Sequence, residues 1–110
     1  MIRGGAVVLD VSDVAQAVRF YVETLGMKLV REAADGSAVV DAGEGFHIAL
    51  RAGPRSTPAL VHLYPKVPIA EAIAIYENRG VVFTVERTAA ETVARFEDPD
   101  GNSLALVQAS

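Results

Sequence analysis

The sequence predicts an α+β protein made of two copies of one βαβββ unit. Segments that alternate apolar and polar residues, as half-buried strands do, occur in the same order on both sides of a central linker, with one helical pattern in each half. Short segments also match between the halves: Phe20-Tyr21-Val22-Glu23 matches Ile75-Tyr76-Glu77, and Ile48-Ala49-Leu50 matches Leu104-Ala105-Leu106. A repeat of a whole supersecondary unit indicates paired copies.

The first half, about residues 1–52, begins with an alternating strand at residues 6–11. Ser12 is the expected N-cap of a helix that Gly26 ends, because glycine suits the position after a helix. Three short strands are expected at residues 28–32, 37–41 and 46–51. The buried side of the helix is expected to comprise Val14, Val18, Tyr21 and Leu25.

Residues 53–58, with two prolines and no large apolar side chain, are the expected linker. The second half, about residues 59–110, should begin with a strand at residues 60–64. Pro68 fits the first turn of a helix that Gly80 ends. Ile69, Ile73 and Tyr76 form its expected buried side. Strands are expected at about residues 81–86, 93–97 and 103–108. Glu86, Arg87 and Glu91 are expected in an exposed hairpin loop. Residues 98–101 are expected to form a turn.

Composition indicates a single domain, because 110 residues suffice for one hydrophobic core. The chain has no cysteine, so it has neither disulfides nor thiolate metal sites. Its net charge of −4 argues against nucleic acid as a partner. No apolar segment reaches membrane-spanning length and no secretion signal is evident, so we expect a cytoplasmic protein without a membrane partner.

Several motifs together resemble the vicinal oxygen chelate superfamily, which includes glyoxalase I, bleomycin resistance proteins, fosfomycin resistance enzymes and extradiol dioxygenases. The motifs are Val11-Ser12-Asp13, Phe20-Tyr21, Leu25-Gly26-Met27 and the segment of residues 96–102. The resemblance implies that the two βαβββ modules form a cupped mixed sheet around a ligand cavity, with the helices on its outer face. It also implies a homodimer.

Strand alternation predicts which side chains face this cavity. In the first strand Val7, Leu9 and Val11 should pack on the helix. Phe46, Ile48 and Leu50 in the strand at residues 46–51, and Leu104 and Leu106 in the last strand, should also face the helices. The alternate residues of these three strands should line the cavity: Ala6, Val8, Asp10, His47, Ala49, Arg51, Ser103, Ala105 and Val107.

The resemblance also implies where a metal would be held, at one position in the first and last strands of each module. Three of these positions are Ala6, Ala49 and Ala105. The fourth is Val61 if the modules align without a gap, or His62 if one residue is deleted near Pro68. Alanine carries no donor atom and a single imidazole binds a divalent ion weakly. We therefore expect a metal-free protein without a cofactor.

Polar side chains on the expected cavity face are the candidates for binding a small-molecule ligand. They are Asp10, His47, Arg51, His62, Tyr64 and Arg95. Four of them have a structural alternative: His62 as a hydrogen-bonded cavity or core histidine, Asp10 as a strand-end carboxylate near the helix start, and the two arginines as solvated strand ends.

Three functions remain open at this point. The first is a small-molecule binding protein that sequesters a compound, as antibiotic resistance proteins of the superfamily do; the 6% aromatic content and the lack of tryptophan make bleomycin itself doubtful. The second is a metal-dependent lyase, isomerase or dioxygenase with a non-standard ligand set, drawn from His47, His62 and Asp10, Asp41 or Glu97. The third is a structural or regulatory dimer with a vestigial cavity.

Overall fold

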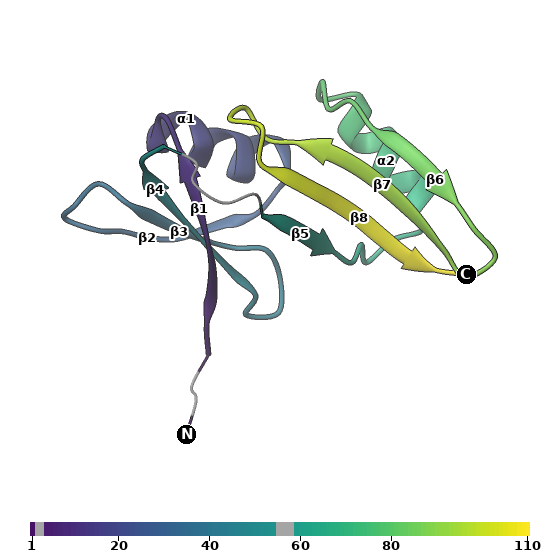
Figure 1. Cartoon of the computed structure of the whole chain (residues 1–110), viewed down its shortest axis with the longest axis horizontal. Coiled ribbons are helices and arrows are strands. Elements are labelled where there is room, and N and C mark those ends of the chain that lie inside the picture. Colours follow the sequence, from purple (N-terminus) through teal and green to yellow (C-terminus); the bar gives the residue numbers. More distant parts are fainter. Residues whose placement is uncertain (2–3, 55–58) are drawn as a thin grey trace. The chain divides into compact units, whose positions relative to one another are not determined.

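Each half of the chain forms its own four-stranded mixed sheet with a helix on one face (Figure 1). The computed structural model describes residues 1, 4–54 and 59–110. The two halves are separate units, Met1–Pro58 and Ala59–Ser110. The predicted linker falls at this boundary, but its residues 55–58 lie outside the described residues.

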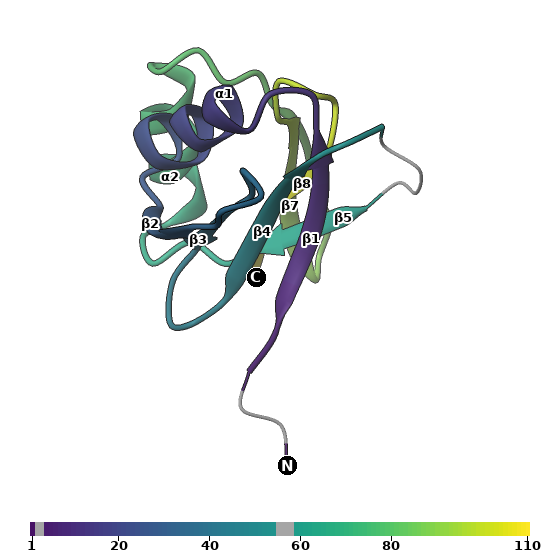
Figure 2. The ribbon, with the colours of Figure 1, turned by 90° about the vertical axis from the view of Figure 1, so that its left-hand side faces the viewer.

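The first unit has the predicted βαβββ order. Its elements are β1 (Ala6–Val11), α1 (Val14–Arg19), the π-helical turn η1 (Phe20–Thr24), β2 (Lys28–Glu32), β3 (Ala38–Asp41) and β4 (His47–Ala52). The strand order is β1-β4-β3-β2, with β1 parallel to β4 and the other pairs antiparallel. Figure 2 shows β1 and β4 running side by side.

The second unit repeats this topology. Its elements are β5 (Leu60–Leu63), α2 (Ile69–Glu77), β6 (Thr84–Arg87), β7 (Glu91–Glu97) and β8 (Ser103–Ala109). The order is β5-β8-β7-β6, with β5 parallel to β8. Among the helices of the described residues, none has both the length and the apolar character needed to cross a bilayer.

Aliphatic residues of β1, β4 and β8 contribute to the cores of the two units. In the first unit Leu9, Val11, Ile48 and Leu50 are at most 1% exposed. In the second unit Leu104 and Leu106 are buried, and so are Ala105 and Val107. Strand alternation predicted that Leu9, Val11, Ile48, Leu50, Leu104 and Leu106 face the helices, whereas Phe46, predicted to do the same, is 38% exposed. On α1 the fully buried residue is Ala17, whereas the predicted Val14 and Val18 are only partly buried, so the buried side is centred differently from the prediction.

The first helix starts one residue later than predicted. Asp13, not Ser12, is its N-cap: the backbone of Asp13 is extended, and its carboxylate accepts a hydrogen bond from the Gln16 N–H at 3.1 Å. The helix then widens, because the Leu25 N–H donates to the Phe20 carbonyl five residues back, at 3.0 Å. Gly26 has a φ of 81° and ends the helix as predicted.

The second helix receives its cap from another element. Pro68 precedes the first turn and makes no side-chain capping bond. The Gln108 side chain, on β8, instead accepts a hydrogen bond from the Ile69 N–H at 3.0 Å. A long-range contact therefore satisfies a helix-end donor that would otherwise lack a partner.

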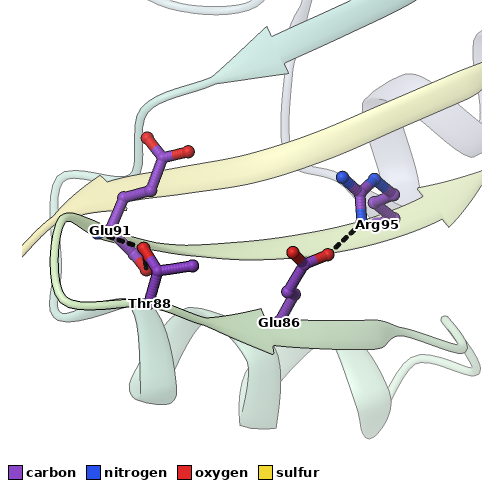
Figure 3. Close-up of polar contacts among 4 residues, drawn as sticks. All are labelled: Glu86, Thr88, Glu91 and Arg95. Carbon is purple, nitrogen blue, oxygen red and sulfur yellow. Dashed lines mark hydrogen bonds and ion pairs between the residues drawn. The ribbon is translucent and has the colours of Figure 1, made fainter.

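The β6–β7 hairpin differs from the prediction in its boundaries. β6 begins at Thr84 and not at residue 81. Glu86, Arg87 and Glu91, which were predicted to lie in the loop, belong to the paired strands, so the loop comprises only residues 88–90. The Thr88 hydroxyl closes that loop by accepting hydrogen bonds from the N–H groups of Ala90 and Glu91, at 3.2 and 3.1 Å. Figure 3 shows Thr88 and Glu91 at this end of the hairpin.

The predicted turn before the last strand is present and is organised by a buried carboxylate. Asp98 accepts hydrogen bonds from the N–H groups of Asp100 and Asn102 and from the Asn102 side-chain amide, each at 2.9 Å. Both Asp98 and Asn102 are buried. This network sets the point at which β8 begins, and hence the side of the sheet on which each of its residues lies.

Gln108→Ala should lower the free energy of unfolding by about 1–2 kcal/mol, because the Ile69 N–H loses its acceptor at a helix N-terminus. Gln108→Glu keeps an acceptor and should lose much less. Urea denaturation followed by circular dichroism measures both variants. Equal stability of wild type and Gln108→Ala would contradict this capping role.

Asp98→Ala should cost about 2–4 kcal/mol, because it removes the acceptor of three hydrogen bonds and leaves the buried Asn102 amide without its partner. The matched control is Asp35→Ala in the exposed β2–β3 turn. There the Ser37 hydroxyl and N–H bond to Asp35 and lower the pKa of its carboxyl group. The control should lose clearly less stability than Asp98→Ala in the same denaturation experiment.

Candidate functional site

The face of the first sheet that α1 does not cover carries the side chains predicted to face a ligand. We call it the helix-free face of the first sheet. Cross-strand pairing places its residues in rows, since directly opposed residues share a face. The rows are Ala6, His47, Asp41 and Lys28; Val8, Ala49, Val39 and Arg31; and Asp10 with Arg51.

Asp10 and Arg51 form an ion pair at the end of this face. The Arg51 Nε donates to Asp10 Oδ1 at 2.7 Å, across the parallel β1–β4 pair. The Asp10 side chain is only 14% exposed, whereas the Arg51 side chain is 62% exposed. A largely buried carboxylate therefore holds an arginine whose remaining surface faces outward.

His47 and Asp41 lie opposite each other in the first row, on β4 and β3. The Asp41 carboxylate accepts a hydrogen bond from the Gly43 N–H at 2.7 Å through Oδ1. Its other oxygen is 3.8 Å from His47 Nε2, within ion-pair range but too long for a hydrogen bond. Both side chains are about one-third exposed. A protonated His47 would be attracted to this carboxylate.

In the second sheet, strand pairing and burial show which of Val61 and His62 lies on the helix-free face. Val61 is buried and pairs with Leu104, which faces α2. His62 is exposed and pairs with Ala105 on the opposite face. The helix-free face of the second sheet thus carries His62, Ala105, Arg95 and Thr84 in one row. The core alternative for His62 is wrong.

The remaining two candidates are also exposed. Tyr64 lies just beyond β5 and is 78% exposed. Arg95 donates from Nη1 to Glu86 Oε2 at 3.0 Å, across the β6–β7 pair (Figure 3). Both partners of that ion pair are at least half exposed, at 52% and 60%. Such surface pairs contribute little to stability.

Comparing the pairing registers of the two sheets identifies one position that the sequence reasoning missed. Ala49 pairs with Val8, and its counterpart Ala105 pairs with His62. Two residues earlier, Ala6 pairs with His47, and Leu60 pairs with Ser103. The internal repeat therefore matches Leu60 with Ala6 and His62 with Val8. The signal in the sequence was the match of Ile48-Ala49-Leu50 with Leu104-Ala105-Leu106, but using it required the register of the partner strands.

The side chains at these positions do not fit a metal ion. Ala6, Ala49, Ala105 and Leu60 are hydrocarbon and offer no nitrogen or oxygen donor, whereas divalent ions need several converging donors. Within the described ranges, no three His, Asp or Glu side chains gather into a group that could hold a metal.

The family model described as Glyoxalase/Bleomycin resistance protein/Dioxygenase superfamily matches residues 5–106. The chain belongs to this superfamily. The two four-stranded mixed sheets with one helix each are the fold that its members share. A comparison with proteins of curated function found no match.

Solved structures of the superfamily resemble the chain along its length. A superfamily member from Sphaerobacter thermophilus DSM 20745 is 28% identical, with 97% of each chain covered and a TM-score of 0.82. TnmS3, an antibiotic binding protein from Streptomyces sp. CB03234, is 27% identical, with 100% of this chain and 99% of that chain covered and a TM-score of 0.82. A glyoxalase/bleomycin resistance protein from the same Streptomyces strain is 27% identical, with 94% of this chain and 100% of that chain covered and a TM-score of 0.76.

The β5 register is tested by a pair of neighbouring substitutions. Val61→Ala should lower the free energy of unfolding by about 2 kcal/mol, because it removes two buried methyl groups. His62→Ala should change it by less than about 0.5 kcal/mol, because the imidazole is exposed. Chemical denaturation of both variants measures the difference. A larger loss of unfolding free energy for His62→Ala than for Val61→Ala would mean that the register of β5 is shifted by one residue, with His62 buried and Val61 exposed.

Proposed function

We propose that this protein binds a small molecule without a metal ion, as a sequestering protein of the antibiotic-resistance type. The observation that carries the proposal is the hydrocarbon character of the positions where the superfamily resemblance places metal ligands, Ala6, Ala49 and Ala105. Leu60, the internal counterpart of Ala6, extends the same pattern. The metal-dependent reactions of the superfamily require a Lewis acid, which these side chains cannot hold.

Similarity to an antibiotic binding protein supports a binding role. TnmS3 aligns with the whole of this chain at 27% identity. The helix-free faces also suit a ligand that is partly apolar, because small aliphatic side chains such as Val8 and Ala49 lie beside charged ones such as Arg51. Sequestration needs only such complementary contacts and no reacting group.

We further propose that the two units act as one domain and that two chains associate as a homodimer. The superfamily resemblance implies both features. Native mass spectrometry of untagged protein tests the second: a species of twice the chain mass is expected, and a spectrum containing only monomer at micromolar concentration would contradict it. The same spectrum reports any compound retained from expression.

The alternative is a metal-dependent lyase, isomerase or dioxygenase with a non-standard ligand set. The pair His47 and Asp41 is the observation that favours it, because the two side chains lie on one face with their nearest atoms 3.8 Å apart. Two protein donors leave most of a coordination sphere to solvent or substrate. Sensitivity to a chelator separates this alternative from the proposal.

A thermal-shift screen with antibiotics and small metabolites tests the proposed function. A ligand at about 100 times its Kd should stabilise the protein by about 2.7 kcal/mol, which raises the Tm of a domain of this size by several degrees. Because no metal takes part, the shift should be the same with and without EDTA. Stabilisation that EDTA abolishes would favour the metal-dependent alternative, and no shift across a broad panel would favour a vestigial site.

A further inference from the structure

We infer that the helix-free face of the first sheet recognises a small molecule with an apolar body and a carboxylate group, and that Arg51 binds the carboxylate. This inference rests on the proposed function and specifies the ligand class. All of the residues that carry it belong to the first unit. They are Asp10 and Arg51 at one end of the face, and Val8, Ala49 and Val39 in the neighbouring row.

The first argument is that Arg51 is held in place and not merely exposed. Asp10 is 14% exposed, so its carboxylate is fixed by the surrounding protein. It accepts a hydrogen bond from Arg51 Nε at 2.7 Å. Among the described residues Asp10 is the hydrogen-bonding partner of Arg51, and the bond uses the Nε side of the guanidinium group. The edge formed by the two Nη groups remains available to a second, planar acceptor.

The ion pair of Arg95 and Glu86 differs from the Asp10–Arg51 pair in the exposure of its carboxylate. Glu86 is 60% exposed, so both side chains of the Arg95–Glu86 pair lie in solvent. In the Asp10–Arg51 pair only the arginine side chain is largely exposed to solvent. Anchoring reduces the conformational entropy that an arginine loses when it binds a ligand, and this pre-organisation favours recognition.

The second argument is the surface next to Arg51. The adjoining row is aliphatic: Val8 pairs with Ala49, and Ala49 pairs with Val39. Val8 is 49% exposed and Ala49 is partly exposed, whereas Val39 is buried, so Val8 and Ala49 form the apolar surface of this row. Adjacent rows lie about 7 Å apart, because two residues of a strand rise by that distance. A ring attached to a carboxylate on Arg51 would therefore be within reach of Val8 and Ala49.

The third argument is charge. Among the residues that the structure describes, the paired strands place the cations Arg51, Arg31 and Lys28 and the acidic side chains Asp10 and Asp41 on this face, and Asp10 is paired with Arg51. The charges of these five side chains sum to +1, which favours an anion over a cation. A guanidinium edge matches a carboxylate with two parallel hydrogen bonds.

Calorimetric titration with 2-naphthoate and 2-naphthamide tests the inference, since the two compounds have nearly the same shape and differ in charge. All titrations contain EDTA. Wild-type protein should bind 2-naphthoate at least about tenfold more tightly than 2-naphthamide, because only the acid forms an ion pair with the guanidinium group in addition to hydrogen bonds. In Arg51→Gln this preference should disappear, because the affinity for 2-naphthoate falls much more than the affinity for 2-naphthamide.

Two further variants make the result decisive. Arg51→Lys keeps a cation beside Asp10, guards against misfolding caused by an unpaired buried carboxylate, and should keep only part of the preference because it lacks the planar edge. Arg19→Gln removes the same charge from α1, on the other side of the sheet, and should keep the whole preference.

Equal affinity of wild type for the two compounds would overturn the inference, as would a preference that survives in folded Arg51→Gln. Failure of both compounds to bind at millimolar concentration would also overturn this choice of ligand class. None of these results would refute the proposed function, which depends on chelator-independent stabilisation by members of the wider panel. Ligand binding that needs a metal would refute the proposed function instead.

Discussion

The pairing register of β4 and β8, the last strand of each unit, is the constraint on which the rest of the structure depends. Side chains alternate between the two faces of a strand, so a shift of one residue would exchange all buried and exposed positions. Ile48 and Leu50 are buried on both sides of Ala49, which places Ala49 on the helix-free face of the first sheet. In β8 Leu104, Ala105 and Leu106 are all buried, and the pairing of Ala105 with the exposed His62 places Ala105 on the helix-free face of the second sheet. The chemistry available there follows from this packing.

Local interactions at the strand ends and helix ends maintain the two registers. The Asp98 network makes the turn from β7 into β8, and the Gln108 side chain joins the end of β8 to the first turn of α2. In the first unit Asp13 caps α1 directly after β1. Each interaction supplies a partner to a backbone donor near a point where an element begins. Together they couple the position of each helix to the register of the sheet beneath it.

Much of the fold could be predicted from the sequence because its strongest signals are local. The alternation in β1, the glycine after the first helix and the turn at Asp98 were all correct to within a residue. Ser12 and Asp13 are both good N-cap residues, and sequence could not rank them because the choice depends on where β1 ends. The cap from Gln108 joins residues 39 positions apart. No pattern along the chain indicates such a contact.

The site was predictable in part for the same reason. Alternation placed Asp10, His47 and Arg51 on one face, and the pairs Asp10–Arg51 and His47–Asp41 then depend on which strands are neighbours. The equivalence of Leu60 with Ala6 also needed the pairing of β5 with β8. Sequence alone left Val61 and His62 as alternatives, because both fit an alternating strand and only the burial of Val61 separates them.

On the helix-free face of the first sheet, the ion pair of Asp10 and Arg51 lies beside the small apolar side chains of Val8 and Ala49. The central claim of the proposed function is that this protein binds its ligand without a metal ion. Calorimetric titration of chelator-treated, dialysed protein with Mn²⁺, Ni²⁺ and Zn²⁺ tests that claim most directly. We expect no stoichiometric binding at micromolar concentrations, and the same result for His62→Ala and His47→Ala. One tightly bound ion per chain, lost on substitution of either histidine, would contradict it.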